Sequence, residues 1–222
     1  VGERLTALNK SPAQLYPNTD AGRAELLASL NAGMADMATR LPRAFHNPPK
    51  DPLEIRRVPP EIEAGASNGY YRPAALDGSR PAIYFINLKS TGDWPKYSLP
   101  ALTYHEGNPG HHLQNSVTQA SGEIPMLRRI AFYSAYGEGW ALYAEQVADE
   151  LGAYKGIERA GYLQSFLFRA ERLVVDTGLN HKRWTREQAI DHMVAATGFA
   201  RPRVQREVER YCASIGQACS YK

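Results

Sequence analysis

The stretch HEGNPGHHLQ, residues 105–114, restricts the fold more than any other part of the chain. The surrounding sequence is rich in helix formers and predicts a helix over about residues 98–120. That helix cannot be straight, because Pro109 lacks an N–H and its ring clashes with the carbonyl group four residues earlier, which belongs to His105. We therefore expect a bulge at residues 108–110 that absorbs two extra residues and keeps both halves of the helix together.

The same stretch contains the residue types of a zinc-binding helix. In an HExxH helix the two histidines lie four residues apart, share one face at about 100° per residue, and can hold one zinc ion. His105 and Glu106 fit this pattern, but the next histidines are His111 and His112. A straight helix favours His112, which is only about 20° away from the first histidine, whereas a bulged helix favours His111. We favour His111 as the ligand and keep His112 as the alternative, with the other histidine bordering the site.

The third ligand is expected from a second helix, over about residues 127–151. Its sequence YGEGWALYAEQVADE places Glu138 between two glycines, each of which costs about 1 kcal/mol relative to alanine. A close backbone approach to the first helix would account for these glycines. Glu145 lies seven residues later on the same face, where it either hydrogen-bonds a ligating histidine from behind or is solvated.

These residues together predict a metal-dependent hydrolase. His105, His111 and Glu138 would hold Zn²⁺, a water would take the fourth position, and Glu106 would act as the general base. Taken singly, a buried histidine or glutamate is more often a hydrogen-bonded core group than a ligand, so the prediction depends on the combination.

Elsewhere the pattern predicts a mainly α (α+β) protein with a small antiparallel sheet before the zinc helix. Helices are expected over residues 20–40 (with Asp20 as the cap), 98–120, 127–151, 156–178, 185–197 (with Thr185 and Gln188 as a capping box) and from 203 to 211. Strands are expected over residues 53–58, 69–73 and 81–88, with Pro59, Pro60, Pro73 and Pro81 at their ends.

Composition excludes several classes of protein. The net charge of +3 and the absence of a basic run argue against a nucleic-acid partner. No stretch of about 18 apolar residues predicts a transmembrane segment. Two cysteines, Cys212 and Cys219, are too few for a structural zinc site, and we expect free thiols or one local disulfide. The chain reads as one catalytic domain, 1–222, divided into a lead-in (1–60), a sheet region (61–97) and a helical core (98–222).

The longest motifs resemble a known family. HEGNPGHHLQ, GEGWALYAEQ, RLVVDTGLNHKRWTREQAI and EVERYCASIGQACSYK, together with YYRPAALDGSRPAIYFINL, are similar to the catalytic half of bacterial proteins grouped as domain of unknown function 885. The resemblance runs from about Val58 to the last residue. It implies a zinc metallopeptidase, a missing helical N-terminal portion that forms part of the cleft, and export, in some members as lipoproteins.

A wider resemblance is to the gluzincins, and among them to thimet-oligopeptidase-like enzymes. There a Gly-His pair closes the zinc helix, as Gly110 and His111 do here, and a glutamate follows about 25 residues later, as Glu138 does. The two-residue insertion in the His-Glu helix departs from that pattern. The resemblance also implies that an edge strand beside the zinc helix pairs with an extended peptide, and residues 82–88 are the candidate.

The end of the chain resembles the tyrosine-rich segment that these peptidases place over the zinc. By that resemblance Tyr221 would stabilise the oxyanion, with Tyr211 in reserve. Gln217 would bind substrate backbone and Arg210 a substrate carboxylate. Read without the resemblance, all four are typical of structural positions. His181, with Asp176 and Arg172 nearby in sequence, either caps a helix end or reaches the cleft.

The sequence therefore predicts a zinc-dependent hydrolase that acts on a peptide or related amide. Two alternatives stay open: a metal-dependent amidase or hydrolase of a small molecule, and a catalytically silent binding domain with the same fold. The substrate, the exo- or endo-preference, the metal in vivo and the oligomeric state do not follow from the sequence.

Overall fold

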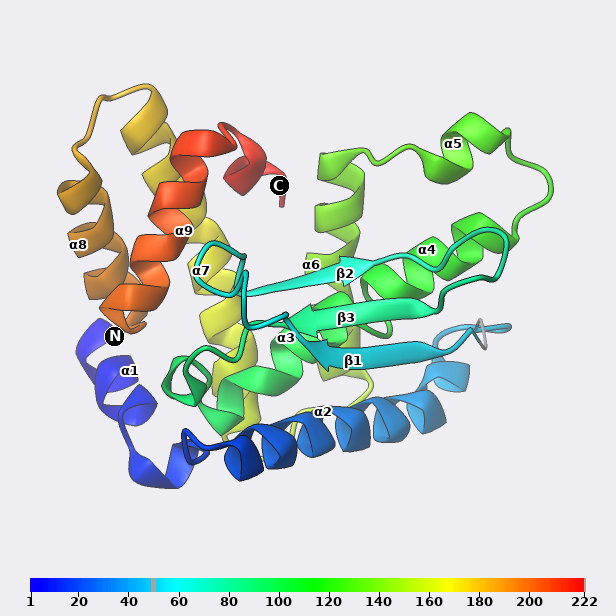
Figure 1. Cartoon of the computed structure of the whole chain (residues 1–222), viewed down its shortest axis with the longest axis horizontal. Coiled ribbons are helices and arrows are strands. Elements are labelled where there is room, and N and C mark those ends of the chain that lie inside the picture. Colours follow the sequence, from blue (N-terminus) through cyan, green and yellow to red (C-terminus); the bar gives the residue numbers. More distant parts are fainter. Residues whose placement is uncertain (49–50, 222) are drawn as a thin grey trace.

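Helix α3 (Leu99–Glu106) runs through the middle of the structure, a computed structural model that describes residues 1–48 and 51–221 (Figure 1). Six of its eight residues are buried. It packs against α2, α6 and α7 and against the sheet. Because its C-terminal end is enclosed by these elements, His105 and Glu106 lie in the interior of the protein.

The fold is mainly α, as predicted, but two of the expected helices are split. The remaining helices are α1 (Gly2–Asn9), α2 (Asp20–Arg40), α4 (His111–Ala120), α5 (Met126–Ile130), α6 (Ser134–Glu150), α7 (Glu158–Asn180), α8 (Arg186–Thr197) and α9 (Arg201–Ala213). The bulge expected within 98–120 is a complete break, since residues 107–110 separate α3 from α4. The helix expected over 127–151 is divided into α5 and α6, and α1 was not anticipated.

Helix ends largely follow their local chemistry. The capping box of Thr185 and Gln188 at the start of α8 is confirmed. At the start of α2 the prediction of Asp20 is wrong, because the Thr19 side chain accepts the hydrogen bond from the Gly22 N–H and Asp20 is already helical. After α6, Gly152 takes a left-handed conformation with φ 69°, which suits a residue without a side chain.

The sheet is mixed rather than purely antiparallel. Strands β1 (Leu53–Arg57), β3 (Ala82–Ile86) and β2 (Gly69–Arg72) lie side by side in that order. β2 pairs antiparallel with β3, but β1 pairs parallel with it. A parallel pair needs a crossover connection, and residues 58–81, which include β2, provide it. The prediction of 82–88 as an edge strand is therefore wrong, since β3 is central and its apolar residues are mostly buried.

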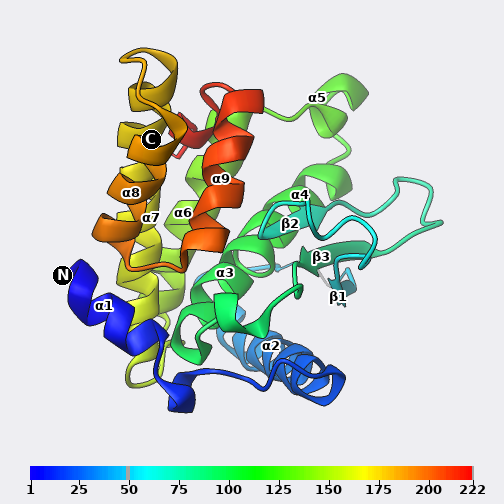
Figure 2. The same ribbon diagram turned by 60° about the vertical axis from the view of Figure 1, so that its left-hand side comes forward.

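The apolar core of the described residues consists of three clusters, two of which include residues of α3. One joins the sheet to α2 and α3, a second joins α2, α3, α4 and α6, and a third lies among α7, α8 and α9. Figure 2 shows α7, α8 and α9 grouped on one side of α3 and the sheet on the other. The expected prolines lie outside the strands, and Cys212 and Cys219 are free thiols.

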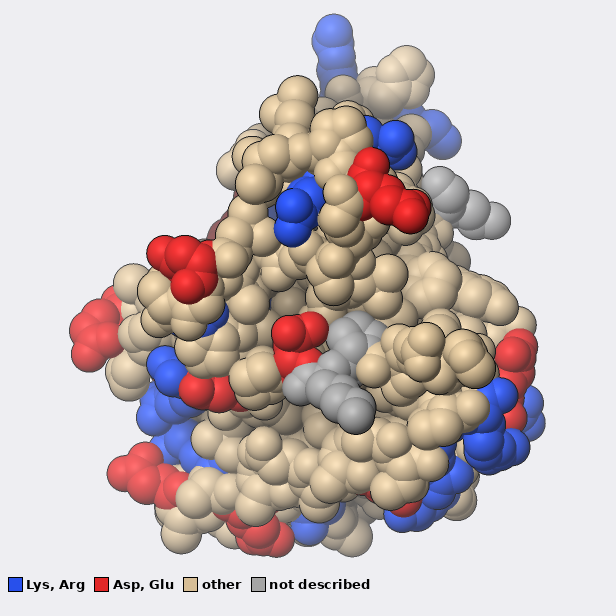
Figure 3. Space-filling model, turned by 90° about the vertical axis from the view of Figure 1, so that its right-hand side faces the viewer, with Lys and Arg blue, Asp and Glu red and all other residues tan. Residues whose placement is uncertain are grey.

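Among the helices of the described residues, none combines the length with the apolar content that crossing a membrane would require. Figure 3 shows acidic and basic side chains scattered over the face that carries α5.

Candidate metal centre

The break between α3 and α4 brings the two halves of the opening motif close together. A Cβ atom on Gly110 would lie 1.9 Å from the His105 carbonyl oxygen, so the chain can turn here only without a side chain. The φ of Gly110 is −78°, and the requirement is therefore one of space and not of backbone conformation. Trp140 of α6 donates a hydrogen bond of 3.0 Å to the carbonyl of Pro109 and fixes the segment against the second helix.

His105, His111 and Glu138 converge on one point. The Oε2 atom of Glu138 lies 3.4 Å from His105 Nε2 and 3.6 Å from His111 Nε2. The three candidate ligand atoms all lie within 4.8 Å of one another, and all three residues are buried. Zinc–ligand bonds of about 2.0–2.2 Å place tetrahedral ligand atoms roughly 3.3–3.6 Å apart. Two of the three separations already have that value, so the donor set fits a small divalent cation.

His112 points away from this cluster. Its Nδ1 lies 3.2 Å from the Tyr71 hydroxyl, and its Nε2 lies 2.9 Å from the backbone carbonyl oxygen of Asp51. Burial lowers the pKa of His112, so its ring is neutral, donates Nε2–H to the carbonyl and accepts from the hydroxyl. Both ring nitrogens are thus engaged, and His112 holds Asp51, just before β1, and Tyr71 of β2 beside the site.

Two carboxylates of α6 bracket the imidazole of His105. Glu138 faces Nε2, while Glu145 lies 2.9 Å from Nδ1 and is completely buried. The seven-residue spacing places both on one face of the helix, and Nδ1–H donation to Glu145 leaves Nε2 free as a ligand atom. Of the two alternatives for Glu145, the structure therefore shows the one that contacts a histidine.

The glycines beside Glu138 do not have the expected cause. A Cβ atom on Gly137 would meet the ring of Phe132 at 2.4 Å, so this glycine accommodates the segment before α6 and not the first helix. A Cβ atom on Gly139 would meet no atom of the described residues within 4 Å, apart from its chain neighbours and the backbone of its own helix. The close approach that the sequence suggested is instead at Gly110.

Proton affinities reflect this arrangement. Burial and the nearby Arg169 lower the pKa of His105, but the carboxylates of Glu138 and Glu145 outweigh them and raise it to about 9. Burial opposes ionisation of Glu138, yet the two histidines bring its pKa well below the usual range. The two carboxylates thus favour positive charge at His105, beside the position that a metal cation would take.

Glu106 lies on the wall of a cavity of about 240 Å³ that the three candidate ligands also line. It is 5% exposed, and its Oε2 atom has no hydrogen-bond partner among the described residues. Burial raises the pKa of its carboxyl group. An unengaged carboxylate beside the candidate metal ligands is placed to accept a proton from a water in the cavity.

The C-terminal turn (Gln217–Cys219) closes over the centre. Gln217 donates a hydrogen bond of 3.0 Å to Glu138 Oε1 and so orients that carboxylate. The ring of Tyr221 lies 6.0 Å from that of His105, and its oxygen accepts a bond of 2.8 Å from Arg172. Burial raises the pKa of Tyr221 to about 12, although Arg172 opposes it. The phenol therefore keeps its proton, which it can donate into the cavity.

The other predicted residues divide between the cavity and its surroundings. Arg210 lines the cavity but already pairs with Glu207 at 2.8 Å. Tyr211 is buried in the cluster of α7, α8 and α9 and does not line the cavity, so the structure does not bring it to the site. His181 is exposed just after the end of α7, as the helix-end alternative requires. Asp176 accepts bonds of 3.1 and 3.2 Å from the Gly216 N–H and anchors the turn that carries Gln217.

Several residues of the cavity were not anticipated from the sequence. Arg169 lies 3.6 Å from Glu145 and 3.5 Å from His105 Nδ1. Arg203 and Glu207 come from α9. In RVQREVERY the charged positions recur at helical spacing beside the buried positions Val204 and Val208. Such a pattern is the same whether the charged row faces solvent or a cavity, so the sequence carries no signal that assigns these two residues to the cavity.

The fold and the cluster define a mainly α protein with a candidate three-ligand metal centre. The chain belongs to the family described as "Bacterial protein of unknown function (DUF885)", whose model matches residues 1–222. None of the curated proteins matches the sequence.

Two solved structures resemble the chain over 99% of its length. The "putative lipoprotein" from Colwellia psychrerythraea has 50% sequence identity and a TM-score of 0.95, and the chain spans 38% of its length. The "putative lipoprotein of unknown function" from Shewanella oneidensis has 18% identity and a TM-score of 0.61, with 45% of its length spanned, and shows a shared fold alone.

Proposed function

We propose that this chain carries the active site of a gluzincin-like zinc metallopeptidase, the C-terminal catalytic part of a longer, exported protein. The observation that carries the proposal is the position of one carboxylate oxygen of Glu138 at 3.4 and 3.6 Å from the Nε2 atoms of His105 and His111. These three side chains would hold Zn²⁺, which when bound would polarise both the attacking water and the scissile carbonyl. Export rests on the lipoprotein description of the relative from Colwellia psychrerythraea.

The chain's own residues have separate roles in this proposal. Glu106 takes the proton of the attacking water and then delivers it to the leaving amine. Tyr221 donates its hydroxyl hydrogen to the negative charge that develops on the carbonyl oxygen, because its own oxygen already accepts from Arg172. Glu145 and Gln217 orient His105 and Glu138, and Arg210 contributes to substrate binding.

Strand β2 replaces β3 as the proposed peptide-binding strand. Gly69, Tyr70 and Tyr71 line the cavity, and within the described residues β2 pairs only with β3. Its other edge therefore offers main-chain groups to an extended peptide that enters beside Glu106.

A smaller substrate is the second candidate. The cavity volume of about 240 Å³ lies below the roughly 300–1,000 Å³ of typical ligand sites, which also suits a small acyl amide. A peptide library and a panel of acyl amides, assayed side by side, distinguish the two substrates.

The metal and the base are tested together. Elemental analysis of the purified protein should show about one zinc per chain. The anomalous scattering peak of the zinc should lie next to His111 and not next to His112. Glu106→Gln should keep the zinc and lose roughly 100-fold or more in kcat. Glu123→Gln, on an exposed glutamate outside the cavity, should change neither. Equal activity of Glu106→Gln and the parent protein would remove Glu106 as the base, and a chain with no activity before mutation would favour a silent binding domain.

A further inference from the structure

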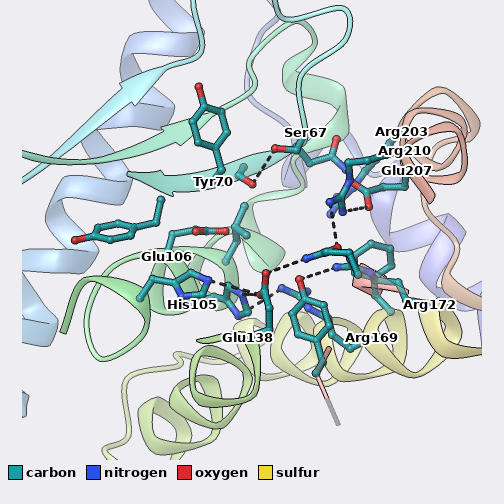
Figure 4. A pocket seen from close by; sticks show the side chains of 18 of the residues that line it. Ser67, Tyr70, His105, Glu106, Glu138, Arg169, Arg172, Arg203, Glu207 and Arg210 are labelled. Atoms are coloured by element: carbon teal, nitrogen blue, oxygen red, sulfur yellow. Dashed lines mark hydrogen bonds and ion pairs between the residues drawn. The ribbon is translucent and has the colours of Figure 1, made fainter. Parts of the chain in front are cut away.

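One end of the active-site cavity is lined by arginines, and the proposed function does not say which group of the substrate they bind. Figure 4 shows His105, Glu106 and Glu138 towards one end of the cavity and Arg203, Glu207 and Arg210 at the other. Arg172 of α7 lies near this second end, and all three arginines line the cavity. We refer to Arg172, Arg203 and Arg210 as the arginine end.

The arginine end carries more positive charge than its neighbours neutralise. Arg210 forms an ion pair of 2.8 Å with Glu207, which also accepts from Asn68. Among the described residues, neither Arg172 nor Arg203 has a carboxylate within 4.0 Å. Among the described residues, Glu207 is thus the one carboxylate in ion-pair contact with these three guanidinium groups.

The two arginines without a carboxylate bond only to neutral groups. Arg172 donates to the Tyr221 hydroxyl and to Gln217 Oε1 at 2.8 and 2.7 Å. Arg203 donates 2.9 Å to the carbonyl of Asp93 and lies over the ring of Phe199 at 3.9 Å. Both are buried, at 3% and 8% exposure, and their Nε atoms have no hydrogen-bond partner in the part of the chain that the structure describes. Buried guanidinium groups are costly without an anion, so these donors are suited to a charged ligand.

We propose that the arginine end binds a carboxylate of the substrate while the scissile carbonyl lies at His105, His111 and Glu138. The proposal deepens the proposed function and rests on it. A cavity of about 240 Å³ leaves space for only a short segment between the two ends. The substrate is therefore a peptide whose carboxylate lies close to the bond that is cleaved. Two sources share this chemistry: the C-terminal carboxylate, which makes the protein a carboxypeptidase, and an acidic side chain.

Three peptides that differ only at the last residue separate these sources in the zinc-loaded protein. The first ends in a neutral residue with a free carboxylate, the second is its C-terminal amide, and the third is an amide whose last residue is glutamate. Charge-assisted hydrogen bonds predict that kcat/KM of the free acid exceeds that of the amide by about 10- to 100-fold. Recovery of that rate by the glutamate amide assigns the carboxylate to a side chain. Equal rates for all three overturn the proposal.

Substitution of Arg203 tests whether the arginine end causes the difference in kcat/KM between the free acid and the amide. Arg203→Gln should reduce the acid-to-amide ratio towards one, and Arg203→Lys should restore part of it. Arg201→Gln is the matched control, since Arg201 lies on the same helix, is exposed and pairs with Glu187 and Asp191. If folded Arg203→Gln has the same acid-to-amide ratio of kcat/KM as the parent protein, Arg203 does not bind the carboxylate. If this variant fails to fold, the comparison of the three peptides still tests the proposal, because it uses the parent protein alone.

Failure of the inference can be told from failure of the proposed function. Calorimetric titration of zinc-loaded Glu106→Gln with the free acid and with the amide measures binding without turnover. A chain that binds no zinc refutes the proposed function, whereas a zinc-loaded chain that binds acid and amide equally refutes only the arginine end.

Discussion

Replacement of Gly110 by alanine tests whether the break between α3 and α4 builds the metal centre. The new Cβ atom would lie 1.9 Å from the His105 carbonyl oxygen and 2.4 Å from that of Tyr104. Both are backbone atoms, so they cannot rotate away as a side chain would. To reach 3.0 Å, the shortest separation that real Cβ atoms show, the two segments must part by about 1.1 Å. Zinc sites tolerate deviations of only about 0.2 Å in ligand distance.

The loss of folding stability follows from the size of that displacement. Overpacking of a well-packed interior costs about 1–3 kcal/mol and occasionally more, and a backbone clash of this size belongs at the upper end. At about 2–4 °C per kcal/mol for a chain of this length, the metal-free protein should melt roughly 6–12 °C lower. Zinc affinity should fall at least 10-fold, because His105 and His111 no longer share one Glu138 oxygen.

Gly139→Ala is the matched control for this experiment. It lies next to Glu138 within α6, but there is open space where its Cβ would stand. Alanine should therefore stabilise the helix by up to about 1 kcal/mol and leave zinc binding unchanged. Thermal melting with and without zinc, together with competition against a chelating dye, measures both quantities. If Gly110→Ala melts within about 2 °C of the parent protein and binds zinc equally well, the close approach does not shape the centre.

Three further outcomes are expected. His112→Gln should retain zinc and lose about 1–3 kcal/mol of unfolding free energy, measured by urea denaturation, because it holds Tyr71 and not the metal. Loss of zinc in this variant would show that His112 is a ligand. Glu145→Gln should weaken zinc binding by about 10- to 100-fold in a chelator titration. Unchanged affinity would show that His105 does not need its hydrogen bond with Glu145 to bind zinc. Burial opposes ionisation of Glu207, but Arg210 outweighs burial and lowers the pKa of this carboxyl group to about 2. The carboxylate therefore stabilises the fold fully above pH 4.5, its ordinary pKa, and loses this contribution as the pH falls towards 2. Glu207→Gln should reduce the loss of unfolding free energy between pH 5 and pH 3, and an unaltered loss would refute that role.

The features that the sequence predicted correctly are those set by local covalent geometry. The ring of Pro109 excludes a straight helix whatever surrounds it, so an interruption near residues 108–110 could be foreseen. The seven-residue spacing of Glu138 and Glu145 fixes them on one face of any helix, and both indeed meet His105. The convergence of these side chains required only that the two helices lie against each other.

What the sequence did not predict depends on contacts between distant segments. The parallel pairing of β1 with β3 is decided by the path of residues 58–81, for which no local signal exists. The reason for Gly137 is the ring of Phe132, which lies outside the helix. The charged row of α9 is the same in sequence whether it faces water or a cavity, so Arg203 could not be assigned to the interior.

The junction between α3 and α4 also limits how the length of the chain can vary. One residue added to or removed from 107–110 would disturb the close approach of Gly110 to the His105 carbonyl and carry His111 off the cluster. Loop 121–125, between α4 and α5, carries no such constraint and can change in length. Insertions and deletions among homologues should therefore spare the first segment and accumulate in the second. A search for two histidines four residues apart will pass over a candidate metal centre of this type.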